Sequence, residues 1–67
     1  MNGGYDMAAY IVRFIRVDGR PNEEYYYMRK EDAIYHYRLF LDDDSGLYSK
    51  IVLLHPNGEV IEELICS

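Results

Sequence analysis

The feature that most constrains the fold is a turn sequence near the C-terminus, His55-Pro56-Asn57-Gly58. Asn57 and Gly58 tolerate the left-handed backbone conformation that tight hairpin turns require. The segments on either side, residues 47–54 and 59–65, have the composition of strands. We therefore predict a hairpin of two antiparallel strands, and with it a fold based on a sheet.

A second pair of strands is predicted in the N-terminal half. Residues 8–17, AAYIVRFIRV, are rich in β-branched and aromatic side chains. Apolar residues such as Phe14 and Ile15 alternate onto both faces, which is typical of a central strand that is covered on both sides. A turn cluster at 18–22 then leads into residues 24–28, which we expect to pair back on the first strand.

One helix is predicted between the two hairpins, near residues 30–42. Glu31 and Asp32 open it, because acidic side chains in a first turn are favoured by the helix dipole. Its apolar positions recur at helical spacing and form one face. Those positions are Ala33, Ile34, Tyr37, Phe40 and Leu41. The run from Asp42 to Gly46 ends the helix, since Gly46 can take the positive φ that such a stop often needs.

These elements predict an α+β fold in the order β-β-α-β-β, with a four-stranded, mostly antiparallel sheet and one helix on one face. The chain of 67 residues supports one small domain, 1–67, with residues 1–7 as a flexible leader. One helix covers only one sheet face, so we expect the other face to meet a partner or a second copy. The residues expected to be most buried are Val12, Phe14, Ile34, Tyr37, Phe40, Ile51 and Leu53.

Several classes of protein are excluded or disfavoured by composition. A single cysteine, Cys66, permits no intramolecular disulfide, so the chain is not a disulfide-stapled secreted scaffold. The start lacks the features of a signal peptide, and the apolar run 51–54 is far too short to span a bilayer. We therefore expect a cytoplasmic protein without membrane contact. A net charge of −5 argues against direct nucleic-acid binding through a basic surface.

No motif predicts catalysis or a bound cofactor. Phosphate-binding glycine patterns are absent, and a calcium loop counted from Asp42 would place its glycine fifth and Leu53 twelfth, which does not fit. Asp32 and His36 are spaced to share a helix face, but a structural metal site needs about four ligands, so a simple Asp–His contact is the favoured interpretation. We expect no catalytic residue, no metal and no cofactor, and an enzyme is the least favoured class.

The distribution of charge is the most informative feature for function. Residues 1–38 hold six acidic and six basic groups, whereas residues 39–67 hold six acidic groups and one lysine. Three consecutive aspartates fall at the predicted negative end of the helix, where the dipole disfavours them. The candidate partner-binding carboxylates are Asp42, Asp43, Asp44, Glu59, Glu62 and Glu63.

Tyrosine is also abundant, with eight in the chain and three in a row at 25–27. Exposed tyrosine is enriched in protein–protein interfaces because it offers a large contact area at low entropy cost. We take Tyr48, Tyr35 and Tyr26 as candidate partner-binding aromatics. Base stacking on the sheet is the competing interpretation, and the acidic charge weighs against it.

We therefore predict a small acidic inhibitor or adaptor that presents carboxylates and tyrosines to the basic, nucleic-acid-binding surface of a larger protein, such as a nuclease. In size and composition alone it resembles the phage and mobile-element DNA mimics of the anti-CRISPR and anti-restriction kind. The alternative is a self-associating structural module, for example a homodimer, without an inhibitor role.

Overall fold

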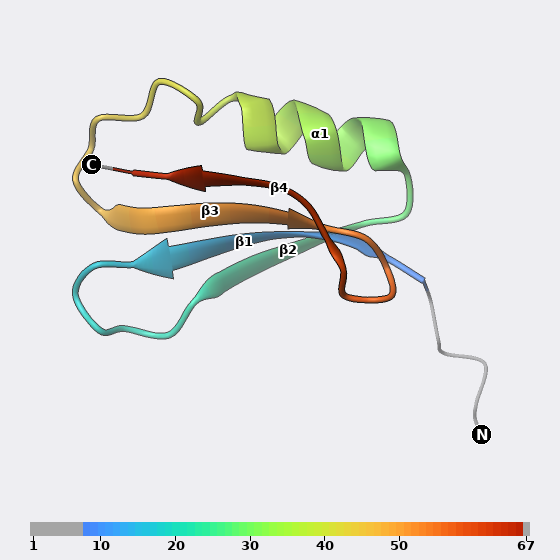
Figure 1. The fold of residues 1–67 in the computed structure, drawn as a ribbon, viewed down its shortest axis with the longest axis horizontal. Helices are drawn as coiled ribbons and strands as arrows, with labels where there is room; N and C mark the ends of the chain where they lie inside the picture. The colour runs from blue at the N-terminus through green and yellow to red at the C-terminus, as the bar shows by residue number, and fades with distance from the viewer. Residues whose placement is uncertain (1–7, 67) are drawn as a thin grey trace.

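The order of elements is β-β-α-β-β, as predicted (Figure 1). A computed structural model describes residues 8–66. Its elements are β1 (Tyr10–Arg16), β2 (Glu23–Tyr27), α1 (Lys30–Arg38), β3 (Tyr48–Leu54) and β4 (Val60–Ile65). The leader predicted at residues 1–7 lies outside the described residues.

The sheet has the strand order β2-β1-β3-β4, and every neighbouring pair is antiparallel. Two local hairpins, β1–β2 and β3–β4, are therefore joined along β1 and β3, where Phe14 pairs with Ile51. The predicted C-terminal hairpin is confirmed: the His55 N–H donates to the Glu59 carbonyl at 2.8 Å, and Gly58 has a φ of 92°. The prediction that the first strand is central is also confirmed.

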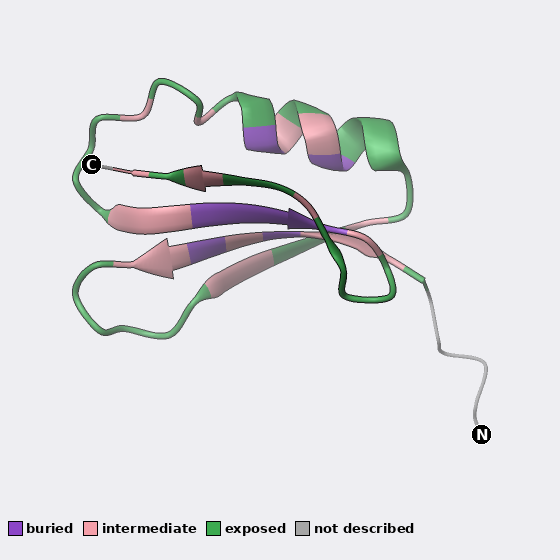
Figure 2. Ribbon diagram, viewed as in Figure 1, coloured by how far each residue is buried: buried purple, intermediate pink, exposed green. Residues whose placement is uncertain are grey.

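Helix α1 covers one face of the sheet and packs on β1, β3 and β2 (Figure 2). Alternate residues of β1 and β3 point toward it, because side chains alternate between the faces of a strand. The buried cluster beneath the helix comprises Val12, Phe14, Ala33, Tyr37, Ile51 and Leu53. Ile34 and Phe40, which were expected among the most buried residues, are only partly buried and pack at the rim of this cluster.

The helix is shorter than predicted and ends at Arg38 instead of near residue 42. After it, the N–H of Phe40 donates to Tyr37 at 3.1 Å and that of Leu41 to Arg38 at 3.3 Å, so the backbone continues as tighter turns. These turns keep Phe40 against the core but move Leu41 off the predicted apolar face, where it is 46% exposed.

The earlier end of the helix changes the setting of the three aspartates. They begin four positions beyond Arg38, and a helix dipole acts mainly within the last turn. The prediction that they oppose the dipole is therefore wrong. The last turn itself carries Arg38, whose positive charge matches the negative end of the dipole.

The sheet face opposite α1, here called the open face, is mixed in character. Val52 and Leu54 of β3 are buried, and the adjoining Ile11 and Ile15 are partly buried. Charged pairs lie among them, because Arg13 of β1 bonds to Glu24 of β2 and Lys50 Nζ lies 3.0 Å from a Glu63 oxygen. Within residues 8–66 no second layer covers this face of β1, so its coverage by a partner or a second copy stays a prediction.

Across residues 8–66, no helix combines the length and apolar character needed to cross a membrane.

Candidate protein-binding surface

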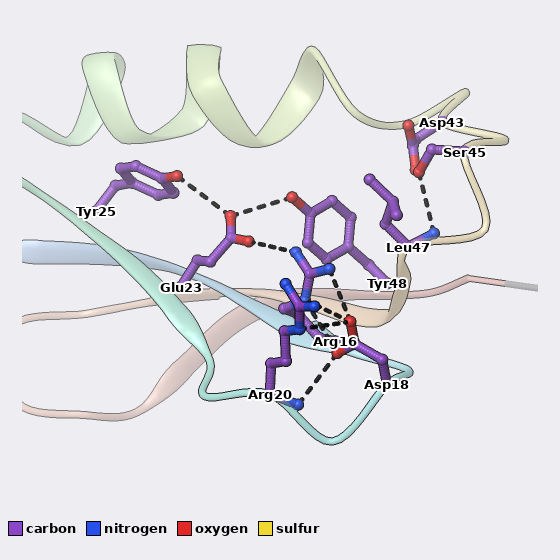
Figure 3. A network of polar contacts seen from close by, with 9 residues as sticks. All are labelled: Arg16, Asp18, Arg20, Glu23, Tyr25, Asp43, Ser45, Leu47 and Tyr48. Atoms are coloured by element: carbon purple, nitrogen blue, oxygen red, sulfur yellow. Dashed lines mark hydrogen bonds and ion pairs between the residues drawn. The ribbon is translucent and has the colours of Figure 1, made fainter.

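A polar network at the end of β1 fixes the first hairpin (Figure 3). The guanidinium of Arg16 donates to Asp18 at 2.9 Å and to Glu23 at 2.9 Å, which ties the strand end to its own turn and to the start of β2. These hydrogen bonds raise the pKa of Arg16 and lower the pKa of Asp18 to about 2. The pKa of Glu23 is also lowered, mainly by its bond from Arg16. All three groups therefore remain charged at neutral pH.

Glu23 also accepts hydrogen bonds from two tyrosines, Tyr48 at 3.1 Å and Tyr25 at 3.2 Å (Figure 3). The ring of Tyr48 lies 5.0 Å from that of Phe14 and packs beside the core. Tyr48 was a candidate for partner binding. The structure gives it a partly buried position between β3 and this network.

A second cluster surrounds His36 on the inner side of α1. Its ring lies 4.9 Å from that of Tyr25 and 5.4 Å from that of Phe14, and Nδ1 lies 2.7 Å from the Tyr27 hydroxyl. Burial among these rings lowers the pKa of His36. Within residues 8–66 no ion pair joins His36 to Asp32, so the contact expected between them is replaced by the bond to Tyr27.

The ion pairs divide the acidic groups of the structure into two sets. Five carboxylates are matched by a basic group, and these are Asp18, Glu23, Glu24, Glu31 and Glu63. Six others in the described part of the chain have no ion-pair partner: Asp32, Asp42, Asp43, Asp44, Glu59 and Glu62. Only two basic residues there lack a partner, Lys30 and Arg38. Pairing therefore neutralises the β1–β2 hairpin and leaves the acidic excess elsewhere.

Three of the unpaired carboxylates lie in the loop after α1, which passes the C-terminal end of β4 (Figure 1), and a fourth, Glu62, lies near the middle of β4. Burial raises the pKa of Cys66, and the nearby charge of Asp43 raises it further. In the same way burial raises the pKa of Tyr37, with a further contribution from Glu62. We call Asp42, Asp43, Asp44 and Glu62 the acidic surface.

Within the acidic surface the aspartates differ in role. A carboxylate oxygen of Asp43 accepts from the Ser45 hydroxyl at 2.8 Å, and Ser45 Oγ in turn accepts the Leu47 N–H at 3.2 Å, which shapes the loop into β3 (Figure 3). Asp42 and Asp44 are exposed. Turn chemistry therefore explains Asp43, while Asp42 and Asp44 present free charge to solvent.

The remaining candidate residues are dispersed. Glu59 lies in the β3–β4 turn, at the end of the sheet away from the Asp42–Asp44 loop (Figure 1). Glu63 pairs with Lys50 on the open face. Tyr35 of α1 and Tyr26 of β2 are exposed, at 68% and 60%, but lie on different layers. The nine predicted residues thus do not form one patch.

The two polar clusters were not predicted as sites. A signal for the first existed, since a hairpin turning at 18–22 brings the end of β1 beside the start of β2, where Arg16 and Glu23 carry opposite charges. The bond between Tyr27 and His36 depends on how the helix is placed over the sheet, which local sequence does not specify. Neither cluster contains a serine, threonine, cysteine or lysine, and among residues 8–66 no three His, Cys, Asp or Glu side chains are grouped as metal ligands.

Comparison of the chain with protein-family models, curated proteins and solved structures finds no match.

Proposed function

We propose that this protein is a small binding module that uses its acidic surface to occupy a basic groove on a larger protein. The observation that supports the proposal is the division of ion pairs. Pairing among residues 8–66 neutralises the β1–β2 hairpin and leaves Asp42, Asp44 and Glu62 without an ion-pair partner in that part of the chain.

A groove that normally holds nucleic acid is the partner of matching chemistry. Such grooves are lined with arginine and lysine. The carboxylates of the acidic surface, which lie on β4 and in the loop after α1, are able to take the place of phosphates there. In this proposal the protein acts as an inhibitor or adaptor of a nuclease or similar enzyme, in the manner of phage and mobile-element DNA mimics. It performs no catalysis and works in the cytoplasm, where its partner meets nucleic acid.

The test compares amide variants of matched shape. The variant Asp42→Asn/Asp44→Asn/Glu62→Gln removes three charges from the acidic surface, and Glu59→Gln removes an exposed carboxylate from the far turn as the control. Each protein is immobilised, and proteins retained from cell lysate are identified over a range of salt concentrations. Retained nucleic-acid-binding proteins are then assayed for loss of nucleic-acid binding when the parent protein is added.

We expect a partner that is retained by the parent and by Glu59→Gln but lost with the triple variant. Charges that meet desolvated arginine or lysine contribute about 2–5 kcal/mol each when one partner is truncated, and retention should fall with added salt. A partner retained equally by the triple variant, or one whose nucleic-acid binding is unaffected, would contradict the proposal.

The alternative function, a self-associating structural module, has an observation of its own in its favour. The sheet ends in two uncovered edge strands, and one of them lacks the features that normally prevent strand pairing between copies.

A further inference from the structure

The two edges of the sheet differ in how well they are protected. Natural edge strands avoid pairing with other chains through bulges, prolines, lysines or unpaired charges. Strand β4 has two of these features: a register shift between Leu53 and Leu54 interrupts its pairing with β3, and Glu62 is an unpaired charge at its middle. Strand β2 pairs with β1 without any shift and contains no proline or lysine.

The charges on β2 are neutralised within its own hairpin. Glu23 is bound by Arg16 at 2.9 Å, and Glu24 is bound by Arg13. The other three residues are Tyr25, Tyr26 and Tyr27, of which Tyr26 is 60% exposed. The edge formed by β2 is therefore neutral and aromatic, whereas the edge formed by β4 is acidic.

We propose that β2 pairs antiparallel with β2 of a second copy of this chain, about a two-fold axis at Tyr25, to form an eight-stranded sheet. An axis at Tyr25 uses all five residues of the strand. It sets Tyr26 against Glu24 of the other copy on the open face and Tyr27 against Glu23 on the helix face, so every pair joins a tyrosine to a carboxylate or to another tyrosine.

Antiparallel pairing of β4 with β4 of a second copy about a two-fold axis is unfavourable. An axis at the middle of β4 sets Glu62 against Glu62 or Glu63 against Glu63, and like charges directly opposite each other destabilise an antiparallel pair. The second copy is therefore expected at β2 and not at β4. This choice leaves the acidic surface, which lies toward the β4 edge, free in both copies.

The helices leave room for this arrangement. Helix α1 packs on β1 and on both of its neighbours, β2 and β3, so it is centred on β1, and in the paired sheet the two β1 strands are separated by three strand spacings, or about 14 Å. Packed helices need only about 8–10 Å between their axes. The two helices can thus lie on the same side of the joined sheet without overlap.

Sedimentation equilibrium of the intact chain over a wide concentration range tests the association. The parent should pass from 7.9 kDa to twice that mass as the concentration rises. Tyr26→Glu sets a carboxylate against Glu24 of the other copy at two symmetric places and should weaken the dimer about tenfold or more. Tyr26→Lys, which replaces that repulsion with an attraction, should dimerise better than Tyr26→Glu. Tyr35→Glu, at an equally exposed tyrosine on α1, is the matched control and should dimerise like the parent.

Cysteine cross-linking tests the register and the face. In a Cys66→Ser background, Tyr25→Cys places two thiols opposite each other across the axis, within disulfide range for directly opposed strand residues. Oxidation should then give a covalent dimer, while Tyr35→Cys in the same background should not. Circular dichroism establishes that each variant is folded.

Several results would overturn the proposal. A single 7.9 kDa species at the highest soluble concentration excludes the dimer. A dimer that forms equally well with Tyr26→Glu, or assemblies larger than two copies, excludes the β2 interface. A dimer that is not cross-linked through Tyr25→Cys excludes pairing about Tyr25 and points to stacking of open faces, because Tyr25 lies on the helix side.

Discussion

The hydroxyl of Tyr27 lies 2.7 Å from Nδ1 of His36, which bonds edge strand β2 to the helix above it. Four aromatic rings surround the imidazole: those of Phe14, Tyr25, Tyr27 and Phe40. In the neutral form of His36, Nδ1 can accept a hydrogen bond from the Tyr27 hydroxyl. Protonation makes both ring nitrogens donors and forces the hydroxyl to turn. The cluster therefore favours the neutral imidazole in the folded state.

The first prediction follows from this preference. The folded-state pKa of His36 lies below its ordinary value of 6.5 because of burial, so the unfolded chain binds a proton more readily. The contribution of neutral His36 to the free energy of unfolding is complete above pH 6.5. It is lost as the pH falls through the folded-state pKa. The free energy of unfolding, measured by urea denaturation between pH 8 and 5, should decrease on acidification. The decrease in the free energy of unfolding per pH unit should be smaller in His36→Phe than in the parent, and the same as the parent in His55→Gln. An equal decrease in all three proteins would contradict the prediction.

A second prediction concerns Arg16 and acid stability. Asp18 and Glu23 both have lowered pKa values because Arg16 hydrogen-bonds to their charged forms. Their contribution to stability is present above the ordinary carboxyl values near 4 and is lost as the pH falls toward 2. The variant Arg16→Met should lose less stability than the parent over this range in thermal melts. Arg29→Met removes an arginine that pairs only with exposed Glu31, whose pKa is lowered chiefly by a backbone hydrogen bond, so it should retain most of the acid sensitivity of the parent.

The third prediction distinguishes the core from the end of the helix. Phe14 is 1% exposed and contacts four aromatic rings, so Phe14→Ala should cost about 3–5 kcal/mol, most of the stability of a domain this small. Leu41→Ala should cost less than about 1 kcal/mol, because the turns after Arg38 leave Leu41 largely exposed. Denaturation midpoints compare the two. A similar loss in both variants would show that residues 39–41 continue the apolar helix face.

The fourth prediction concerns the turn between β3 and β4. Gly58 has a φ of 92°, and nothing lies within 4 Å of the Cβ that a substitution would add. The cost of Gly58→Ala is therefore purely conformational, about 1–2 kcal/mol. Gly58→Asn should cost less, because asparagine tolerates positive φ better. Thermal unfolding of the three proteins should rank them as parent, Asn variant and Ala variant; an alanine variant as stable as the parent would contradict this explanation.

Local patterns were sufficient to predict most of the architecture. The turn at His55–Gly58 and the alternation of Val12 and Phe14 required only short-range rules of turn chemistry and strand periodicity. The helix end was missed because Phe40 does reach the core and fits a helical period, although the backbone that delivers it has already tightened into turns. A four-residue difference in where the helix ends then moved the aspartates out of reach of the dipole.

The candidate surface was harder to predict, because charge totals along a sequence do not show which charges meet. Lys50 was the only basic residue of the C-terminal part, and the antiparallel register sets it opposite Ile65, from where it reaches Glu63 diagonally on the same face. Glu59 was separated from the three aspartates of the loop after α1 by the length of the hairpin. Tyr48 packs beside Phe14 and donates a hydrogen bond to Glu23, which lies 25 positions earlier in the sequence.

The strand order has a consequence for how the chain assembles. Each hairpin forms between strands that are neighbours in sequence. The pairing of β1 with β3 is different, because β2 and α1 lie between these strands in the chain. Closing this longer loop has a larger entropy cost, so we expect β1 and β3 to pair late in folding. The loop at 42–47 crosses this divide and is largely exposed. A chain cut there yields one fragment with β1, β2 and α1 and another with β3 and β4. Neither fragment alone buries Phe14 against Ile51, and mixing the two should restore that contact, which would make the protein a natural candidate for a split reporter.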